Sequence, residues 1–111
     1  MPTVPSLGEF EQIVLLAVLR LQDSAYGVSI RREIAKRTGR DPSAGALYTT
    51  LDRMEHKGLV KSRMGDPTPE RGGRAKRYYV VTGSGRVAIA RAQRAYRRML
   101  EGLEIPGGAR V

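Results

Sequence analysis

The stretch SAGALYTTLDRMEHKGLV, residues 43–60, decides the fold and also raises the functional question. Leu47, Leu51 and Met54 recur at helical spacing and Gly58 is a typical helix end, so the stretch predicts a helix that runs into a strand. Its two acidic and two basic residues cancel, although the whole chain carries a net charge of +9. The helix is therefore either an ordinary amphipathic helix or the working surface of a protein whose charge lies elsewhere.

Positive charge lies on both sides of this neutral stretch. Residues 31–40 contain five basic residues and one acidic residue, a net charge of +4, and residues 61–77 contain six and two, again +4. A third block, residues 86–104, contains five and two and adds +3. Together with a sequence pI of 10.6, this distribution favours a polyanionic partner, above all nucleic acid.

Composition narrows the class of protein. A length of 111 residues predicts one domain that often relies on a second copy of itself. The chain has no cysteine and one histidine, which leaves no disulfide framework, catalytic triad or metal cluster, so we expect neither an enzyme nor a cofactor nor a metal. The start of the chain does not resemble a signal peptide and its longest apolar run, residues 13–19, is too short for a bilayer, so we expect a cytoplasmic protein without membrane contact.

Periodicity and turn residues predict a single order of elements. The expected helices are Leu7–Leu21 with Ser6 as cap, Gly27–Thr38, a third from Ser43, and Thr82–Glu104; the expected strands are 59–64 and 76–81, joined by a basic loop. This order predicts an α+β fold, mostly α: a winged helix-turn-helix with a C-terminal dimerisation helix. The expected division is a DNA-binding domain at 1–81, the dimerisation helix at 82–104 and a flexible tail at 105–111.

Three segments resemble the signature segments of the PadR family of bacterial transcriptional regulators. They are DSAYGVSIRREI (23–34), SAGALYTTLDRMEHKGLVKSR (43–63) and GGRAKRYYVVTGSG (72–85), and the resemblance covers residues 7–104. It implies a homodimeric winged-helix repressor that binds a roughly palindromic duplex DNA operator. In many members of the family, a small molecule or another signal releases the DNA.

The third helix is the expected reading helix. Small groups near its start allow a close approach to base edges, threonine can bond bases or touch thymine methyl groups, and arginine can pair with guanine. A serine cap, free backbone N–H groups and a tyrosine hydroxyl can hold phosphate, and the resemblance also implies that this tyrosine contacts DNA. The candidate contacts are Ser43, Ala44, Gly45, Tyr48, Thr49, Thr50 and Arg53.

Basic residues on either side are candidates for phosphate contacts. The second helix presents a basic face beside the reading helix, and the loop between the strands is rich in arginine and glycine. Charge runs are also typical of plain solvated faces, so each single residue stays open at this point. The candidates are Arg31, Arg32 and Lys36 in the second helix and Arg71, Arg74 and Lys76 in the hairpin.

The last helix carries a heptad-like apolar seam that predicts a homodimer. Its members are Ile89, Ala92, Tyr96, Met99 and Leu103. A long terminal helix needs a partner for such a stripe, which can be its own domain or, as we expect, an antiparallel or crossed second copy. The resemblance implies that the first helix joins this interface, which adds Phe10 and Val14. Tyr96 and Met99 are also candidates for lining a pocket for a hydrophobic or aromatic effector, although such residues more often only pack.

Two other functional classes remain open from the sequence. The same basic surfaces suit a non-specific architectural protein that binds DNA or RNA. The apolar seam suits a dimeric ligand-binding or protein-interaction module. Competition by unrelated duplex DNA separates the first from a sequence-specific regulator, and failure to bind DNA with tight binding of an apolar dye indicates the second.

Overall fold

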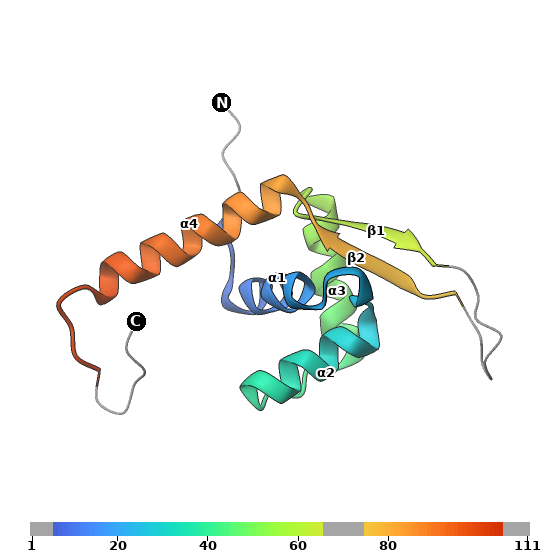
Figure 1. The fold of residues 1–111 in the computed structure, drawn as a ribbon, viewed down its shortest axis with the longest axis horizontal. Helices are drawn as coiled ribbons and strands as arrows, with labels where there is room; N and C mark the ends of the chain where they lie inside the picture. Colours follow the sequence, from blue (N-terminus) through green and yellow to red (C-terminus); the bar gives the residue numbers. More distant parts are fainter. Residues whose placement is uncertain (1–5, 66–74, 106–111) are drawn as a thin grey trace.

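The chain folds into three short helices, a β-hairpin and a longer last helix (Figure 1). The computed structural model describes residues 6–65 and 75–105. Its elements are α1 (Glu9–Leu21), the short 3₁₀ helix η1 (Gln22–Ser24), α2 (Gly27–Thr38), α3 (Ala44–His56), β1 (Val60–Met64), β2 (Arg77–Val81) and α4 (Gly83–Leu100). The predicted α+β, mostly helical winged helix-turn-helix with an appended C-terminal helix is confirmed.

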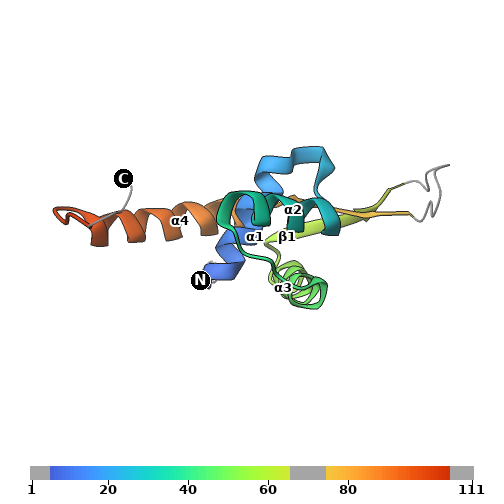
Figure 2. The ribbon, with the colours of Figure 1, turned by 90° about the horizontal axis from the view of Figure 1, so that it is seen from below.

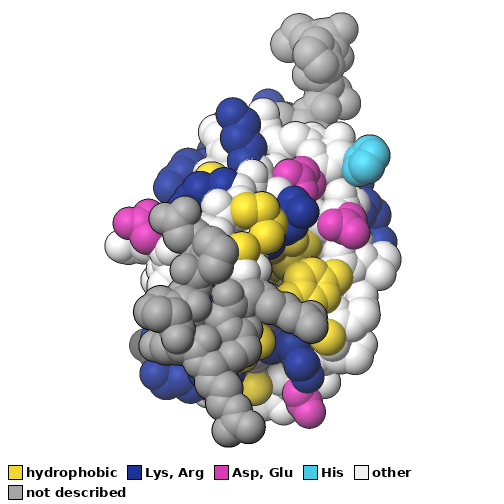
Figure 3. All heavy atoms as spheres, turned by 90° about the vertical axis from the view of Figure 1, so that its right-hand side faces the viewer, with side chains coloured by type: hydrophobic (Ala, Val, Ile, Leu, Met, Phe, Trp, Pro, Cys, Tyr) yellow, Lys and Arg dark blue, Asp and Glu magenta, His cyan; other side chains and the backbone are white. Residues whose placement is uncertain are grey.

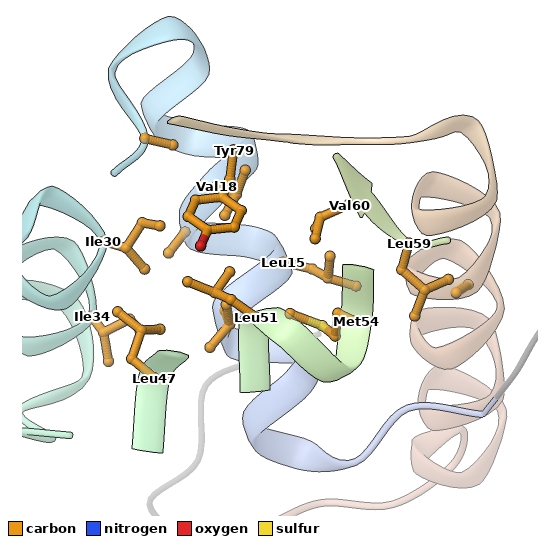
Figure 4. Packing of buried hydrophobic residues seen from close by; sticks show 14 residues of the cluster. Leu15, Val18, Ile30, Ile34, Leu47, Leu51, Met54, Leu59, Val60 and Tyr79 are labelled. Atoms are coloured by element: carbon orange, nitrogen blue, oxygen red, sulfur yellow. The ribbon is translucent and has the colours of Figure 1, made fainter. Parts of the chain in front are cut away.

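One hydrophobic core joins the three helices to the inner face of the hairpin (Figure 4). Each fully buried aliphatic or aromatic side chain contributes roughly 1.5–3 kcal/mol relative to exposure, so this cluster fixes how α3 sits on α1 and α2. The predicted stripe of α3 lies in it. The largest fully buried side chains are those of Val14, Leu15, Val18, Ile30, Ile34, Leu47, Leu51, Met54, Leu59, Val60 and Tyr79.

The hairpin forms a two-stranded sheet, and a short backbone pairing joins it to the segment before α2. β1 and β2 pair antiparallel, with Val60 opposite Val81 and Met64 opposite Arg77. The segment before α2 runs along the free edge of β2: Tyr26 and Tyr78 form an isolated bridge, and the backbone N–H of Tyr79 donates to the carbonyl of Ala25 at 2.9 Å. This edge pairing ties the hairpin to the start of α2.

The helix boundaries near the reading helix agree with the sequence prediction. α2 has the predicted limits, and Gly39 follows it with a φ of 74°, the left-handed conformation that favours glycine. Ser43 caps α3, because its hydroxyl oxygen accepts a hydrogen bond from the backbone N–H of Ala46 at 3.0 Å. Gly58 ends the turn after α3 with a φ of 75°.

Two predicted helix ends were wrong. α1 begins at Glu9, not Leu7, and Ser6 is not its cap. Gly8 precedes the helix instead, and its backbone N–H donates to the Glu11 carboxylate at 2.9 Å, which satisfies an amide that the helix itself leaves free. α4 ends at Leu100, four residues early, because the backbone of Glu101 leaves the helical region.

The start of α4 is bound tightly to the turn between α3 and β1. The Thr82 hydroxyl accepts from the N–H of Gly85 at 3.0 Å and donates to the carbonyl of Gly58 at 2.6 Å, while the Thr82 N–H donates to the carbonyl of Leu59 at 3.0 Å. A Cβ at Gly85 would lie 2.2 Å from that Leu59 oxygen. Thr82 is thus the cap of α4, and beyond it the helix extends away from the other helices (Figure 1).

Candidate nucleic-acid interface

α3 lies at the edge of the molecule (Figure 2). On the side that faces away from the core, the first residues of α3 have small side chains or none. Ala44, Gly45 and Thr49 are exposed there, and no described heavy atom lies within 4 Å of a Cβ built on Gly45. Ser43 is exposed beside its cap bond. A duplex groove can therefore approach the first turns of the helix closely, as the sequence predicts.

Thr50 does not belong to this exposed side, and predicting a base contact for it was wrong. Its exposed fraction is 4 %, because its position turns it towards the same side as Leu47, Leu51 and Met54. The helical wheel places Thr50 on the flank of the apolar stripe, where a residue of intermediate polarity can face either way. Its small side chain lets α3 settle onto the core, and Thr49 remains the threonine available to DNA.

Tyr48 packs against the first residue of α2. A Cβ built on Gly27 would lie 2.0 Å from the Tyr48 hydroxyl, so only a glycine permits this placement. The ring remains 43 % exposed. The hydroxyl thus lies beside the start of α2, where helix N–H groups are free, and the two together suit a phosphate oxygen.

The predicted cations of α2 have different surroundings. Arg32 and Lys36 are exposed. Arg31 is partly buried and braces the turn that leads into α3: its Nε donates to the carbonyl of Pro42 at 2.9 Å, and its Nη2 lies 3.7 Å from an Asp41 carboxylate oxygen. Arg31 therefore has a structural task that the sequence did not reveal.

Arg53 is held by a carboxylate from α1. Its Nε donates to Oε2 of Glu11 at 3.2 Å, and Nζ of Lys57 donates to the same oxygen at 3.2 Å. Half of the Arg53 side chain, 51 %, is exposed, whereas only 8 % of the Glu11 side chain is. Sequence reasoning missed Glu11, because an acidic residue in the first turn of a helix is common and its partners are 42 and 46 positions away.

The carboxylate of Glu11 is stabilised in its charged form. Burial raises its pKa, but the hydrogen bonds from the N–H of Gly8 and from Lys57 and Arg53 outweigh that effect and hold the pKa below its ordinary value of 4.5. At neutral pH this buried group is therefore an anion that attracts two cations of the α3 region.

The loop end of the hairpin places cations over aromatic rings. Nζ of Lys76 lies 4.5 Å from the centre of the Tyr26 ring, and Cζ of Arg63 lies 5.0 Å from that of Tyr78. The two rings meet edge to face with centroids 5.7 Å apart. Figure 3 shows this end of the molecule, with Lys and Arg side chains around hydrophobic ones. The other predicted hairpin contacts, Arg71 and Arg74, lie outside the described residues.

This arrangement of reading helix, basic flank and hairpin matches a family of regulators. The model of the Transcriptional regulator PadR-like family matches residues 15–91. The chain belongs to this family. Its members are transcriptional regulators rather than enzymes, and the DNA-binding winged helix is shared with them.

Individual relatives agree with this PadR-like assignment. The chain is 35 % identical over 88 residues to "Transcriptional regulator Rv3488" of Mycobacterium tuberculosis, covering 78 % of this chain and 74 % of that protein. It is similar to a PadR family transcription regulator from Clostridium difficile R20291, with 27 % identity and a TM-score of 0.67 over 81 % of this chain and 90 % of that one. A PadR family transcriptional regulator from Eggerthella lenta shares the fold at 24 % identity, with a TM-score of 0.66 over 85 % and 81 % of the two chains.

The apolar seam of this PadR-like chain divides into an inner and an outer part. Ile89 is 7 % exposed and Ala92 is partly buried, because the first half of α4 packs on its own domain. The outer part projects into solvent: Tyr96 is 68 % exposed and Met99 78 %. Leu103, which is 65 % exposed, lies beyond the end of α4, so placing it in the helical seam was wrong. Tyr96 and Met99 therefore have no enclosing wall within the described part of one chain.

The two predicted contributions of α1 also differ. Val14 has no exposed surface in its own chain, so it has none to offer a partner, and its assignment to a dimer interface was wrong. Phe10 is only partly buried, and the guanidinium carbon of Arg40 lies 5.5 Å from the centre of its ring. Among residues 6–65 and 75–105, no helix is both long enough and apolar enough to cross a membrane.

Proposed function

We propose that this chain is a sequence-specific regulator that binds duplex DNA as a homodimer and represses transcription from a palindromic operator. Each copy of α3 reads one half-site, and cations of α2 and the hairpin neutralise phosphates on either side. In this proposal the protein acts in the cytoplasm, on a bacterial chromosome.

The observation that carries the proposal is the exposed start of α3. Ala44, Gly45 and Thr49 give it a small, uncharged surface at the edge of the molecule, with Arg53 one turn beyond Thr49. A helix that binds DNA only through charge needs no such surface. A base-reading helix does, because its backbone must come close to the groove floor.

The exposed outer seam of α4 supports the homodimer. Tyr96 and Met99 in α4 and Leu103 just beyond it are all more than half exposed, an unusual placement for large apolar side chains unless a partner covers them. A second copy offers the same seam, which is the self-complementarity that a two-fold interface needs. Two-fold symmetry in the protein in turn calls for two-fold symmetry in the operator.

Selection of binding sites from random duplex DNA tests the proposal. We expect a palindromic consensus whose half-sites are about one helical turn, roughly 34–36 Å, or a multiple of it apart. Unrelated duplex DNA should displace the selected DNA from the protein only when it is present in large excess. Equal displacement by any duplex would indicate an architectural protein, and no binding at all would indicate an interaction module. Placing the selected site across a promoter in a transcription assay should lower the transcript.

We further propose that a small hydrophobic or aromatic effector binds between the two α4 helices, beside Tyr96 and Met99. The support is their joint exposure, since two such seams together can enclose a space that one leaves open. Titration with an apolar fluorescent dye tests this. Binding that is lost in Met99→Ala and that lowers operator affinity agrees with the proposal, and the absence of dye binding contradicts it.

A further inference from the structure

We propose that Glu11 is a positioning residue that fixes the guanidinium of Arg53 for reading a base, so that a residue outside the reading helix helps to determine sequence preference. The inference rests on the proposed function as a sequence-specific regulator. It assigns a specificity role to α1, which otherwise only packs in the core.

Burial and hydrogen bonds fix the position of the Glu11 carboxylate independently of Arg53 and Lys57. Its side chain is 8 % exposed, Oε1 accepts from the backbone N–H of Gly8 at 2.9 Å, and Oε2 accepts from Arg53 and Lys57. A buried charge persists only when its lone pairs are satisfied, and here both oxygens have donors. The bond to Gly8 anchors the carboxylate to the backbone, so it orients the two long side chains and not the reverse.

The contact with Glu11 uses Nε of Arg53, which leaves the two terminal amino groups of the guanidinium available to a base. Arg53 donates through Nε, and no hydrogen bond from its two terminal amino groups to a described residue accompanies this contact. Those amino groups are the ones that pair with the O6 and N7 acceptors of guanine. Thr49 lies four residues before Arg53 and is therefore on the same exposed side of α3.

Fixing an arginine before DNA arrives improves both affinity and selectivity. A free arginine loses several rotatable bonds when it meets a base, and that entropy loss opposes binding. A guanidinium that is already fixed has paid this entropy loss before DNA binds. It can also form hydrogen bonds in fewer orientations, so a wrong base leaves its N–H donors unpaired. A role in folding alone predicts no such selectivity, and this difference makes the inference testable.

A second carboxylate cluster provides a matched control. Glu33 of α2 also accepts from two cations, Arg20 at 3.1 Å and Arg37 at 2.6 Å, and among the described residues no hydrogen bond or ion pair joins it to α3. Glu33→Gln therefore removes the same charge from the same kind of cluster. It should leave base preference unchanged.

The main experiment measures binding to the selected operator and to every single base-pair variant of one half-site. Wild type, Arg53→Ala, Glu11→Gln, the double variant and Glu33→Gln are compared. We expect Glu11→Gln to lose roughly tenfold discrimination at the same base pairs as Arg53→Ala, within the range of one bidentate contact. The double variant should lose no more than Arg53→Ala alone, because both substitutions remove one contact.

Three outcomes of this experiment decide against the inference. Uniform weakening over all sequences in Glu11→Gln, or losses that add in the double variant, would show that Glu11 acts on stability and not on reading. An unchanged base profile overturns it as well. A wild-type protein that selects no consensus overturns the proposed function itself, which separates the two failures.

A measurement on the wild type keeps the inference testable if Glu11→Gln does not fold. The Nε–H resonance of Arg53, assigned by its disappearance in Arg53→Lys, should exchange with water more slowly than that of exposed Arg32. The protection should persist in the operator complex. Rapid exchange in the free protein, or loss of protection on binding, means that Glu11 does not hold Arg53 while it reads.

Discussion

At the scale of single residues, the absence of a side chain at Gly27 shapes the reading surface. Substitution Gly27→Ala places a Cβ 2.0 Å from the Tyr48 hydroxyl and 2.7 Å from Cζ of the ring. We expect the ring to swing into solvent at a stability cost of about 1 kcal/mol, the low end for overpacking, with weaker binding of all DNA sequences. Thermal unfolding and titration with operator and unrelated duplex measure the two effects.

Gly83→Ala is the control for this substitution, since no described atom lies within 4 Å of a Cβ there and the residue belongs to α4. It should leave DNA affinity unchanged. Unaltered DNA binding in Gly27→Ala would mean that Tyr48 contacts no phosphate from its present position.

The carboxylate of Glu11 predicts a defined dependence of stability on pH. Its folded-state pKa lies below the ordinary value of 4.5, so the stability it contributes is complete above that value and is lost as pH falls through the folded-state pKa. Glu11→Gln should lower the free energy of unfolding by about 1.5–3 kcal/mol at pH 7, the range for a hydrogen bond to a charged group. The gap to wild type should narrow below about pH 4.5.

Denaturant unfolding at several pH values measures that gap, and Glu104→Gln, an exposed carboxylate beyond α4, controls for the loss of one charge. A gap that stays constant down to pH 3 would contradict the lowered pKa of Glu11 in the folded protein.

These residues also show what a sequence leaves undetermined. The small residues at the start of α3 could be assigned to its exposed side from spacing alone. Thr50 could not, because the direction of a flanking residue depends on how far the helix rolls on its core. Glu11 could not either, because its partners meet it only after α1 and α3 pack.

At the scale of elements, the outer half of α4 should control association. Met99→Glu places a charge in the exposed part of the seam, so we expect the dimer to dissociate while the winged helix remains folded. Light scattering coupled to gel filtration measures the mass, and circular dichroism measures the helix content. Ala90→Glu, exposed and on the other side of α4 by helical spacing, introduces the same charge and should leave the dimer intact.

A monomeric wild type at micromolar concentration would contradict the homodimer directly. Operator affinity should fall as the dimer dissociates, because a monomer offers a single α3 helix and can bind only one half-site.

Element boundaries were predicted best where local chemistry decides them. The limits of α2 and the cap of α3 follow from Gly39 and Ser43, whose roles are properties of the residues themselves. The ends of α1 and α4 were wrong by two and four residues. The start of α1 depends on a carboxylate that reaches back to Gly8. The end of α4 is followed by Gly102, whose φ of 78° is typical of a glycine that ends a helix, and periodicity alone overlooked this signal and overestimated the length of α4.

At the scale of the whole molecule, the charge distribution predicts strong salt dependence of DNA binding. Each phosphate contact that is lost should flatten the slope of log affinity against log salt by about 0.9. Lys76→Gln should cause one such change and should weaken operator and unrelated duplex alike, because Lys76 stands at the loop end of the hairpin and not on α3. Binding titrations over a series of salt concentrations measure the slope.

Arg20→Gln removes the same charge near the end of α1, where Arg20 pairs with Glu33, and it should leave the slope unchanged. A loss of preference at one base pair in Lys76→Gln would instead assign the hairpin to base reading.

The joint at Thr82 and Gly85 has a consequence for how such proteins diverge. It binds the start of α4 to the turn that follows α3, so in the proposed homodimer each α4 and its winged helix would turn as one rigid piece. The spacing and relative orientation of the two α3 helices would then be set at the contact between the two α4 helices, away from the bases that α3 is proposed to contact. Substitutions in α4 alone could therefore change the spacing between the two half-sites that a descendant of this chain recognises, while the bases recognised within each half-site stay the same.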